Sequence, residues 1–172
     1  MKYLRILPLL LAFVSLSALS GCKCACTTPT ARTAPGPVVN LQEITVRQLR
    51  QGYLEGRFTV VEVVQNYLNR IEAIDRNGPA LNAVVAVNPD ALKIAAELDA
   101  ELKAGRPRGP LHGIPLLLKD NIDTMDPMPT TAGATVLRAS YAGRDSWVAK
   151  KLREAGAVIL GKANLSEWAN FR

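Results

Sequence analysis

Cysteine, histidine and clustered positive charge are scarce in this chain of 172 residues, and each scarcity excludes a class of protein. Its only cysteines, Cys22, Cys24 and Cys26, lie too close together to staple a fold, and with no histidine nearby they make an incomplete zinc site. Lys and Arg total 21 against 15 Asp and Glu, but they are scattered, so the net charge of +6 indicates solvated surface rather than a nucleic-acid-binding face. Because 48% of the residues are hydrophobic and 21% are charged, the sequence is typical of a globular protein that relies on its core.

The N-terminus has the layout of a secretory signal. Lys2 and Arg5 precede an almost unbroken apolar stretch over residues 6–19, which is too short to span a bilayer as a mature helix. The segment Leu-Ser-Gly-Cys that ends at Cys22 resembles the lipobox of bacterial lipoproteins, in which the cysteine is acylated and becomes the new N-terminus. The alternative is a plain secretory signal that is cleaved near Gly21, with Cys22 merely adjacent.

The chain divides into a signal peptide (residues 1–21), a Thr-, Pro- and Ala-rich tether (22–40) and a folded portion (41–172). Capping boxes begin at Thr45 and Thr59, and an apolar stripe with helical period follows the second. Asn88 is expected to cap a third helix, and Ser146 or Asp145 a fourth. The pattern predicts helices over 45–51, 59–75, 88–105 and 146–156, a further helix from Asn164, and strands over 81–87, 116–119 and 157–160. Alternating helices and buried strands indicate an α/β layered domain with largely parallel strands.

Lys119 ends a hydrophobic strand, at the position where α/β enzymes place their sites. Apolar neighbours would disfavour the charged form of this lysine and allow it to act as a base. The alternative is a lysine that reaches solvent with its stem along the core. Lys162 is expected to be an exposed loop lysine, and Asn164 a helix N-cap.

Three blocks in order carry a resemblance: Gly-Ile-Pro-Leu-Leu-Leu-Lys-Asp-Asn over 113–121, Thr-Thr-Ala-Gly over 130–133, and Gly-Ala-Val-Ile-Leu-Gly-Lys-Ala-Asn-Leu-Ser-Glu-Trp over 156–168. Together they resemble the amidase signature family. The resemblance implies an α/β/α fold around a large, mixed, largely parallel sheet, of which this chain is an incomplete N-terminal portion. It also implies a Ser-Ser-Lys hydrolase in which Lys119 is the catalytic base.

The two serines of that triad are expected beyond Arg172, because none of the serines after the signal has a Gly-Ser-Ser context. Ser146 is explained as a helix cap, and Ser166 as a first-turn residue. His112 is the only histidine, and without a serine elbow it is predicted to be a turn residue. Through the resemblance, Asn164 gains a secondary role in lining the substrate cleft.

The function expected from these observations is hydrolysis of linear amide C–N bonds by an exported lipoprotein, of which this chain is a truncated piece that is inactive by itself. Its partners would be a small-molecule or peptide amide substrate and the membrane of the bacterial envelope, held through lipid on Cys22 at the periplasmic or extracellular face. No metal, cofactor or nucleic acid is implied. A component of a tRNA amidotransferase belongs to the same family, but the export signal disfavours it. The alternative from another class is a non-catalytic lipoprotein, either an interaction module or a degenerate remnant.

Overall fold

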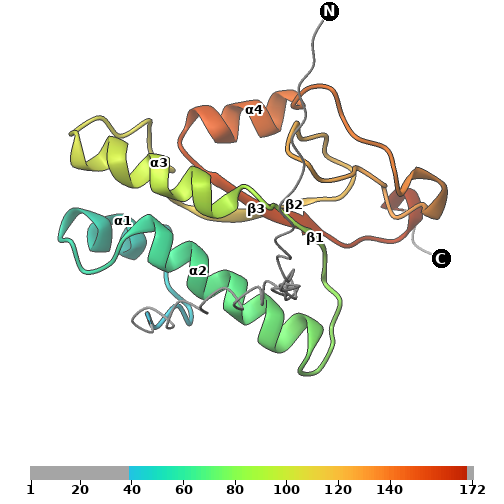
Figure 1. Ribbon diagram of the computed structural model, residues 1–172, viewed down its shortest axis with the longest axis horizontal. Coiled ribbons are helices and arrows are strands. Elements are labelled where there is room, and N and C mark those ends of the chain that lie inside the picture. Colours follow the sequence, from blue (N-terminus) through green and yellow to red (C-terminus); the bar gives the residue numbers. More distant parts are fainter. Residues whose placement is uncertain (1–38, 170–172) are drawn as a thin grey trace, which may run out of the picture. The chain divides into compact units, whose positions relative to one another are not determined.

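The computed structural model describes residues 39–169, so the predicted signal peptide and Cys22 lie outside the described part. Helices and strands alternate along it (Figure 1). None of the helices in this part is both long and apolar enough to cross a membrane. The elements are α1 (Val46–Leu54), α2 (Val60–Arg70), η1 (Ile71–Arg76), β1 (Val84–Val87), α3 (Ala91–Lys103), β2 (Pro115–Lys119), η2 (Thr135–Leu137), α4 (Trp147–Glu154), β3 (Val158–Ala163) and η3 (Glu167–Ala169).

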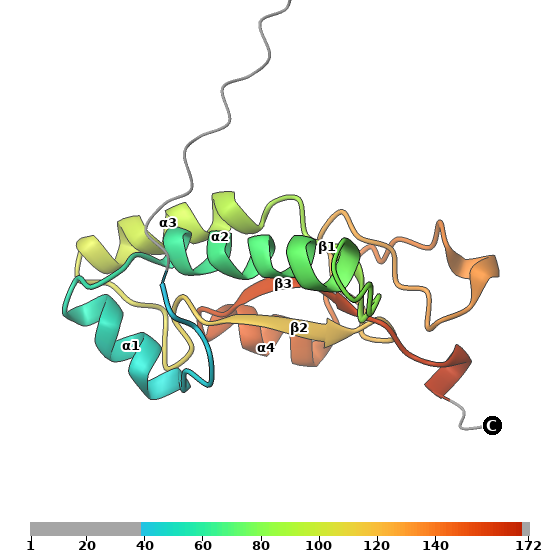
Figure 2. The same cartoon turned by 90° about the horizontal axis from the view of Figure 1, so that it is seen from below.

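The three strands form one mixed sheet in the order β1–β3–β2. The central strand β3 pairs with β2 in parallel and with β1 antiparallel. Helices α2 and α3 lie on one face of the sheet and α4 lies on the other (Figure 2). The predicted α/β fold with a mixed sheet between helices is therefore confirmed.

Two hydrophobic clusters fill the two sides of this sheet. The larger joins α1, α2 and α3 to Val158 and Leu160 of β3. The smaller joins Ile159 of β3 and Leu118 of β2 to Met128 and to Ala149 of α4. Because consecutive residues of β3 face opposite sides, this strand is buried on both faces, as its continuous apolar sequence predicts.

Both predicted capping boxes are present. The side chains of Thr45 and Thr59 each accept a hydrogen bond from the backbone amide three residues later, and the side chain of that later residue accepts one from the backbone amide of the threonine. The buried carboxylate of Asp99 in α3 also accepts from the amides of Val60 and Val61, at 2.8 and 3.0 Å. Helix α2 is therefore held at its first turn by α3 as well as by its own cap, which satisfies amides that have no partner within the helix.

One predicted helix start is wrong and another is displaced. Helix α3 begins at Ala91, but Asn88 makes the contact expected of a cap, because its Oδ1 atom accepts from the Asp90 amide at 3.0 Å. The side-chain amide of Asn88, which is buried, also donates to the Ile159 carbonyl at 2.8 Å. No regular helix starts at Asn164 within the described residues; a single 3-10 turn, Glu167–Ala169, follows, and Trp168 in it has a φ of 54°. The helix predicted over 59–75 is also interrupted, since it continues as the π-helical segment η1 after Arg70.

One irregularity in the pairing of β2 with β3 changes the side of the sheet that the last side chains of β3 face. Leu116 pairs with Ile159 but Leu117 pairs with Gly161, so Leu160 has no partner in the register. An extra residue of this kind reverses the alternation of side chains beyond it. At Gly161 a Cβ atom would lie 2.4 Å from the Ala86 carbonyl oxygen, so the adjacent backbones approach closely only because this residue has no side chain.

We expect Gly161→Ala to destabilise the fold by about 1–3 kcal/mol, because the added methyl group forces β1 and β3 apart. The matched control is Gly143→Ala, where a Cβ atom meets nothing within 4 Å. Removing the freedom of glycine there should be neutral or stabilising by about 0.4–1 kcal/mol. Urea denaturation of both variants measures the difference, and equal unfolding free energies would show that β1 and β3 do not need this close approach.

Candidate active site

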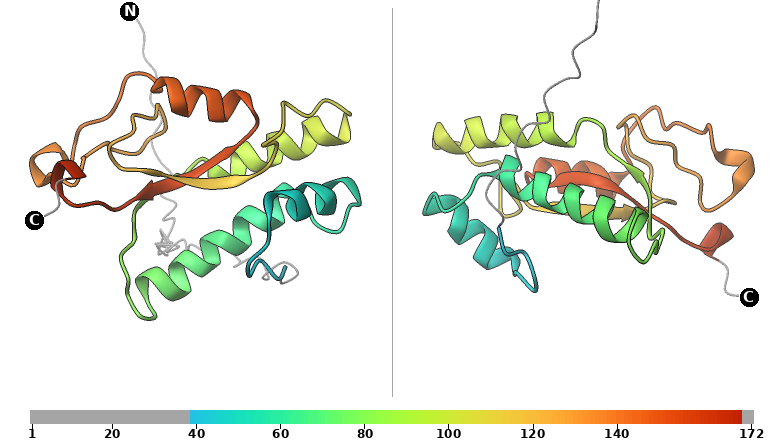
Figure 3. Two further views of the ribbon diagram at one scale, coloured as in Figure 1. Left: turned by 180° about the vertical axis from the view of Figure 1, so that it is seen from behind. Right: turned by 60° about the horizontal axis from the view of Figure 1, so that its bottom comes forward.

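The C-terminal ends of β2 and β3 lie side by side because these strands are parallel. The loop that follows β2 and the segment that follows β3 leave the sheet at the same end (Figures 1 and 3). In open α/β sheets this end is where ligands bind. All three sequence blocks that carry the family resemblance contribute residues here.

Lys119 is the last residue of β2 and its side chain is exposed, which agrees with the alternative of a lysine that reaches solvent and not with that of a lysine among apolar neighbours. The reason is alternation along the strand, since Leu118 and Asp120 on either side of it are buried. The Lys119 Nζ atom donates a hydrogen bond of 2.7 Å to the backbone carbonyl of Asn164. The end of β2 is thus joined to the end of β3 through this amine, and the catalytic role of Lys119 stays a prediction.

Asn164 holds the start of β1 rather than the start of a helix. Its amide donates to the Ala83 carbonyl at 2.8 Å, and its side-chain amide donates to the Asn82 carbonyl at 3.1 Å. Its own carbonyl remains turned toward Lys119. The expected N-cap role is therefore wrong, and its expected role in lining a substrate cleft stays a prediction.

Asp120 connects β2 to the second sequence block. Its side chain is buried, and one carboxylate oxygen accepts a hydrogen bond from the Thr131 hydroxyl. Its carbonyl accepts from the Ala132 amide at 2.9 Å, and its amide donates to the Ala163 carbonyl at 3.0 Å. The other carboxylate oxygen, Oδ1, has no hydrogen-bond partner within the described residues.

The second block also packs against the third. Gly133 has a φ of 74°, and a Cβ atom there would lie 2.7 Å from the Leu165 carbonyl oxygen, so a residue without a side chain is required. Its neighbour Ala132 has a φ of 49° and accepts a hydrogen bond of 2.8 Å from the Trp168 amide. Non-glycine residues with positive φ are uncommon, and where they gather they often mark functional sites. The three blocks therefore meet at one edge of the sheet.

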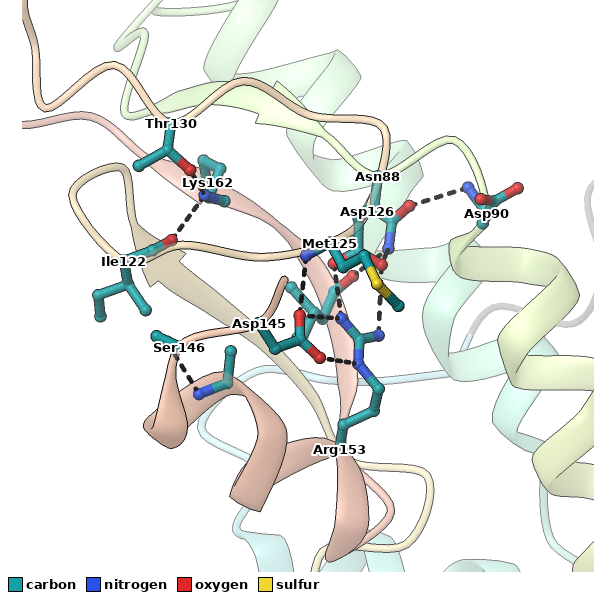
Figure 4. Close-up of polar contacts among 12 residues, drawn as sticks. Asn88, Asp90, Ile122, Met125, Asp126, Thr130, Asp145, Ser146, Arg153 and Lys162 are labelled. Carbon is teal, nitrogen blue, oxygen red and sulfur yellow. Dashed lines mark hydrogen bonds and ion pairs between the residues drawn. The ribbon is translucent and has the colours of Figure 1, made fainter. Parts of the chain in front are cut away.

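Lys162 is the buried lysine of this site, and its predicted placement on an exposed loop is wrong. It lies in β3 with none of its surface exposed. Its Nζ atom donates to the Ile122 carbonyl at 2.7 Å and to the Thr130 hydroxyl at 3.0 Å (Figure 4). Burial lowers the pKa of the Lys162 ammonium, while Asp120 is the strongest of several aspartates that oppose this effect.

A second cation, Arg153 of α4, binds the same loop at Asp126 and its end at Asp145. Its guanidinium lies between the carboxylates of Asp126 and Asp145 and donates to both of them, at 2.8 and 3.0 Å (Figure 4). Burial works against its charge, but these hydrogen bonds outweigh burial and raise the pKa of Arg153 above its usual value. Asn88 also donates to Asp126, at 3.0 Å, so the network reaches the sheet. Sequence reasoning missed this network, because Arg153 lies 8 residues from Asp145 and 27 from Asp126, and no local motif joins the three.

His112 is a buried scaffold residue near the start of β2. Its Nδ1 atom accepts from the Arg108 amide at 3.0 Å, so Nε2 carries the proton and donates to the Leu98 carbonyl, also at 3.0 Å. The Tyr53 hydroxyl donates to the Gly113 carbonyl at 2.9 Å. These bonds fix the strand that ends at Lys119, and the predicted turn location of His112 is confirmed. Across residues 39–169, no group of three acidic, histidine or cysteine side chains is placed to hold a metal ion.

Comparison with known proteins places these features in a family of enzymes. The native peptide amidase from Stenotrophomonas maltophilia superposes with a TM-score of 0.72 at 54% sequence identity, over 76% of this chain and 26% of that one. A bacterial aryl acylamidase superposes with a TM-score of 0.65 at 28% identity, over 73% of this chain and 26% of that one.

Among curated sequences, a probable amidase of Arabidopsis thaliana is 48% identical over 135 residues, which are 77% of this chain and 26% of that protein. A component of the glutamyl-tRNA(Gln) amidotransferase of Alkaliphilus metalliredigens is 38% identical over 132 residues, or 76% of this chain and 26% of that protein. The chain therefore spans about a quarter of the length of the relatives it matches. A family model described as Amidase matches residues 62–172, which include all three sequence blocks. The chain belongs to the Amidase family.

Proposed function

We propose that this protein is part of an exported, lipid-anchored enzyme that hydrolyses amide C–N bonds, with Lys119 as its catalytic base. The observation that carries the proposal is the position of Lys119. Its amine stands at the C-terminal edge of the sheet, exposed, and within hydrogen-bond distance of the segment that follows β3. A base that works on a second group must be accessible to it, and an exposed lysine at this edge meets that condition.

The proposed chemistry follows the Ser-Ser-Lys scheme that the resemblance implies. An uncharged Lys119 amine accepts a proton from a bridging serine, which in turn takes the proton of the nucleophilic serine. The nucleophile forms a C–O bond to the amide carbonyl carbon, the C–N bond breaks, and the nitrogen leaves with a proton as the amine. Water then hydrolyses the acyl-enzyme. We place both serines outside the 172 residues, so this chain alone should not turn over substrate.

A peptide amide is the proposed substrate class, with small-molecule amides as the wider group. The identity of 54% with a peptide amidase, against 28% with an aryl acylamidase, supports this choice. The similarity to the amidotransferase component is lower than that to the peptide amidase, and the predicted export signal disfavours a role in the cytoplasm. The anchor would be lipid on Cys22, joined to the folded portion by the predicted tether.

In a chain that carries this sequence and the rest of the amidase domain, Lys119→Ala should lower kcat by roughly a hundred- to ten-thousandfold, because the relay loses its proton acceptor. Lys119→Arg should be nearly as damaging, since a guanidinium stays protonated. The control is Lys103→Ala, which removes an exposed lysine from the last turn of α3. Steady-state hydrolysis of a peptide amide measures the effect, and full activity of Lys119→Ala would remove Lys119 from the mechanism. Lys162→Ala would not serve as a control, because Lys162 is buried and its loss would disturb the structure.

We expect the mature protein to begin at Cys22 and to carry lipid there when the chain is expressed with its signal in a bacterium. Cys22→Ala should abolish the lipid and release or trap the precursor, whereas Cys24→Ala should be processed normally. Intact-mass analysis of membrane and soluble fractions distinguishes these outcomes. A mature chain that starts at another residue, or an unmodified Cys22, would favour the plain secretory signal.

A further inference from the structure

Lys162 is buried on the loop side of the sheet because of the irregularity in β3. Val158 and Leu160 pack toward α2 and α3, whereas Ile159 packs toward α4. Regular alternation would place Lys162 on the same side as Leu160. The extra residue reverses this, and Lys162 pairs in register with Leu118, which also belongs to the cluster on the α4 side. The irregularity thus aims a lysine at the loop after β2, as such irregularities often do near active sites.

The contacts of Lys162 bracket one stretch of that loop. Its ammonium donates to the Ile122 carbonyl, near the beginning of the loop, and to the Thr130 hydroxyl, at the start of the second sequence block. A buried ammonium is costly unless acceptors replace its water, so these two bonds strongly favour a single loop position. Asp120 holds the same block from β2, through the Thr131 hydroxyl and the Ala132 amide.

The block fixed in this way reaches Lys119 through a short series of contacts. Ala132 accepts a hydrogen bond from Trp168, and Gly133 lies directly against Leu165. Leu165 follows Asn164, whose carbonyl accepts the hydrogen bond from the Lys119 amine. These contacts connect the loop to the carbonyl that accepts the hydrogen bond from the proposed base.

We propose that Lys162 is a positioning residue, which fixes the loop of residues 122–133 over the ends of β2 and β3 and so sets the orientation of the Lys119 amine. This proposal depends on the proposed function for one point only, the role of Lys119 as the base. Lys162 does not itself contact substrate, since none of its surface is exposed and two acceptors occupy its amine. Arg153 does not replace it, because Arg153 binds the carboxylates of Asp126 and Asp145, whereas Lys162 binds the Ile122 carbonyl and the Thr130 hydroxyl.

Hydrogen exchange of the full 172-residue chain tests the first half of the proposal. Lys162→Met keeps an unbranched side chain without the terminal amine, so Ile122 and Thr130 lose their donor. It should speed exchange of the Thr130 and Ala132 amides by roughly ten-fold while leaving the Val63 and Ile94 amides of α2 and α3 unchanged. The matched control is Lys150→Met, whose lysine side chain is 65% exposed on α4. Unchanged exchange in the loop, or equal acceleration in every segment, would overturn the proposal.

Acylation of amines by a small reagent, followed by peptide mass spectrometry, tests the second half on the same variants. Lys162→Met should make Lys119 react several-fold faster, because the hydrogen bond from the Lys119 amine to the Asn164 carbonyl is weakened. The reaction of Lys103 should be unchanged, so Lys103 serves as the internal reference. An unchanged ratio of Lys119 to Lys103 would overturn the link to the base. If Lys162→Met does not fold, both measurements are made on Thr130→Val, which removes only one of the two acceptors of the Lys162 amine. Neither measurement involves amide hydrolysis, so failure here leaves the proposed activity standing.

Discussion

A charged amine buried at the end of β3 constrains the structure around it. The ammonium of Lys162 has no access to solvent, so its hydrogen bonds must be satisfied by protein groups. Those groups come from the loop after β2, and the loop is therefore tied to the central strand rather than only to its own ends. The close approach of β1 and β3 at Gly161, immediately before Lys162, belongs to the same arrangement.

Two cations bind this loop and fix its position. Lys162 binds it from the sheet at Ile122 and Thr130, and Arg153 binds it from α4 at Asp126 and Asp145 (Figure 4). Burial raises the pKa of the Asp145 carboxyl, but the hydrogen bonds from Arg153 and from the Met125 amide outweigh burial and bring it below its usual value. The loop is long and largely irregular, so these polar contacts replace the regular hydrogen bonds that helices and strands provide.

Features that depend on neighbouring residues could be predicted from the sequence. The capping boxes at Thr45 and Thr59, the cap at Ser146 and the strand that ends at Lys119 all have local signatures, and all are present. The order of three sequence blocks also indicated the family, which the family model and the solved relatives confirm.

Features that depend on strand register could not be predicted in the same way. The side of the sheet on which Lys119 and Lys162 lie is set by alternation and by one irregularity. The isolated Gly161 in the strand pattern is a signal for such an irregularity, but it does not tell which side the following residue faces. For this reason Lys162, which was expected on an exposed loop, is buried. Asn88 has the local signature of a cap and accepts from the Asp90 amide, but its further contacts with Ile159 and Asp126 involve residues distant in the chain.

The central claim is that Lys162 fixes the loop through Thr130, and a double-mutant cycle tests it most directly. Unfolding free energies would be measured by urea denaturation for the wild type, Lys162→Met, Thr130→Val and the double variant. Residues in one hydrogen-bonded network are coupled by about 0.5–3 kcal/mol, and the account predicts a coupling in this range. Strict additivity of the two substitutions, within about 0.3 kcal/mol, would contradict it.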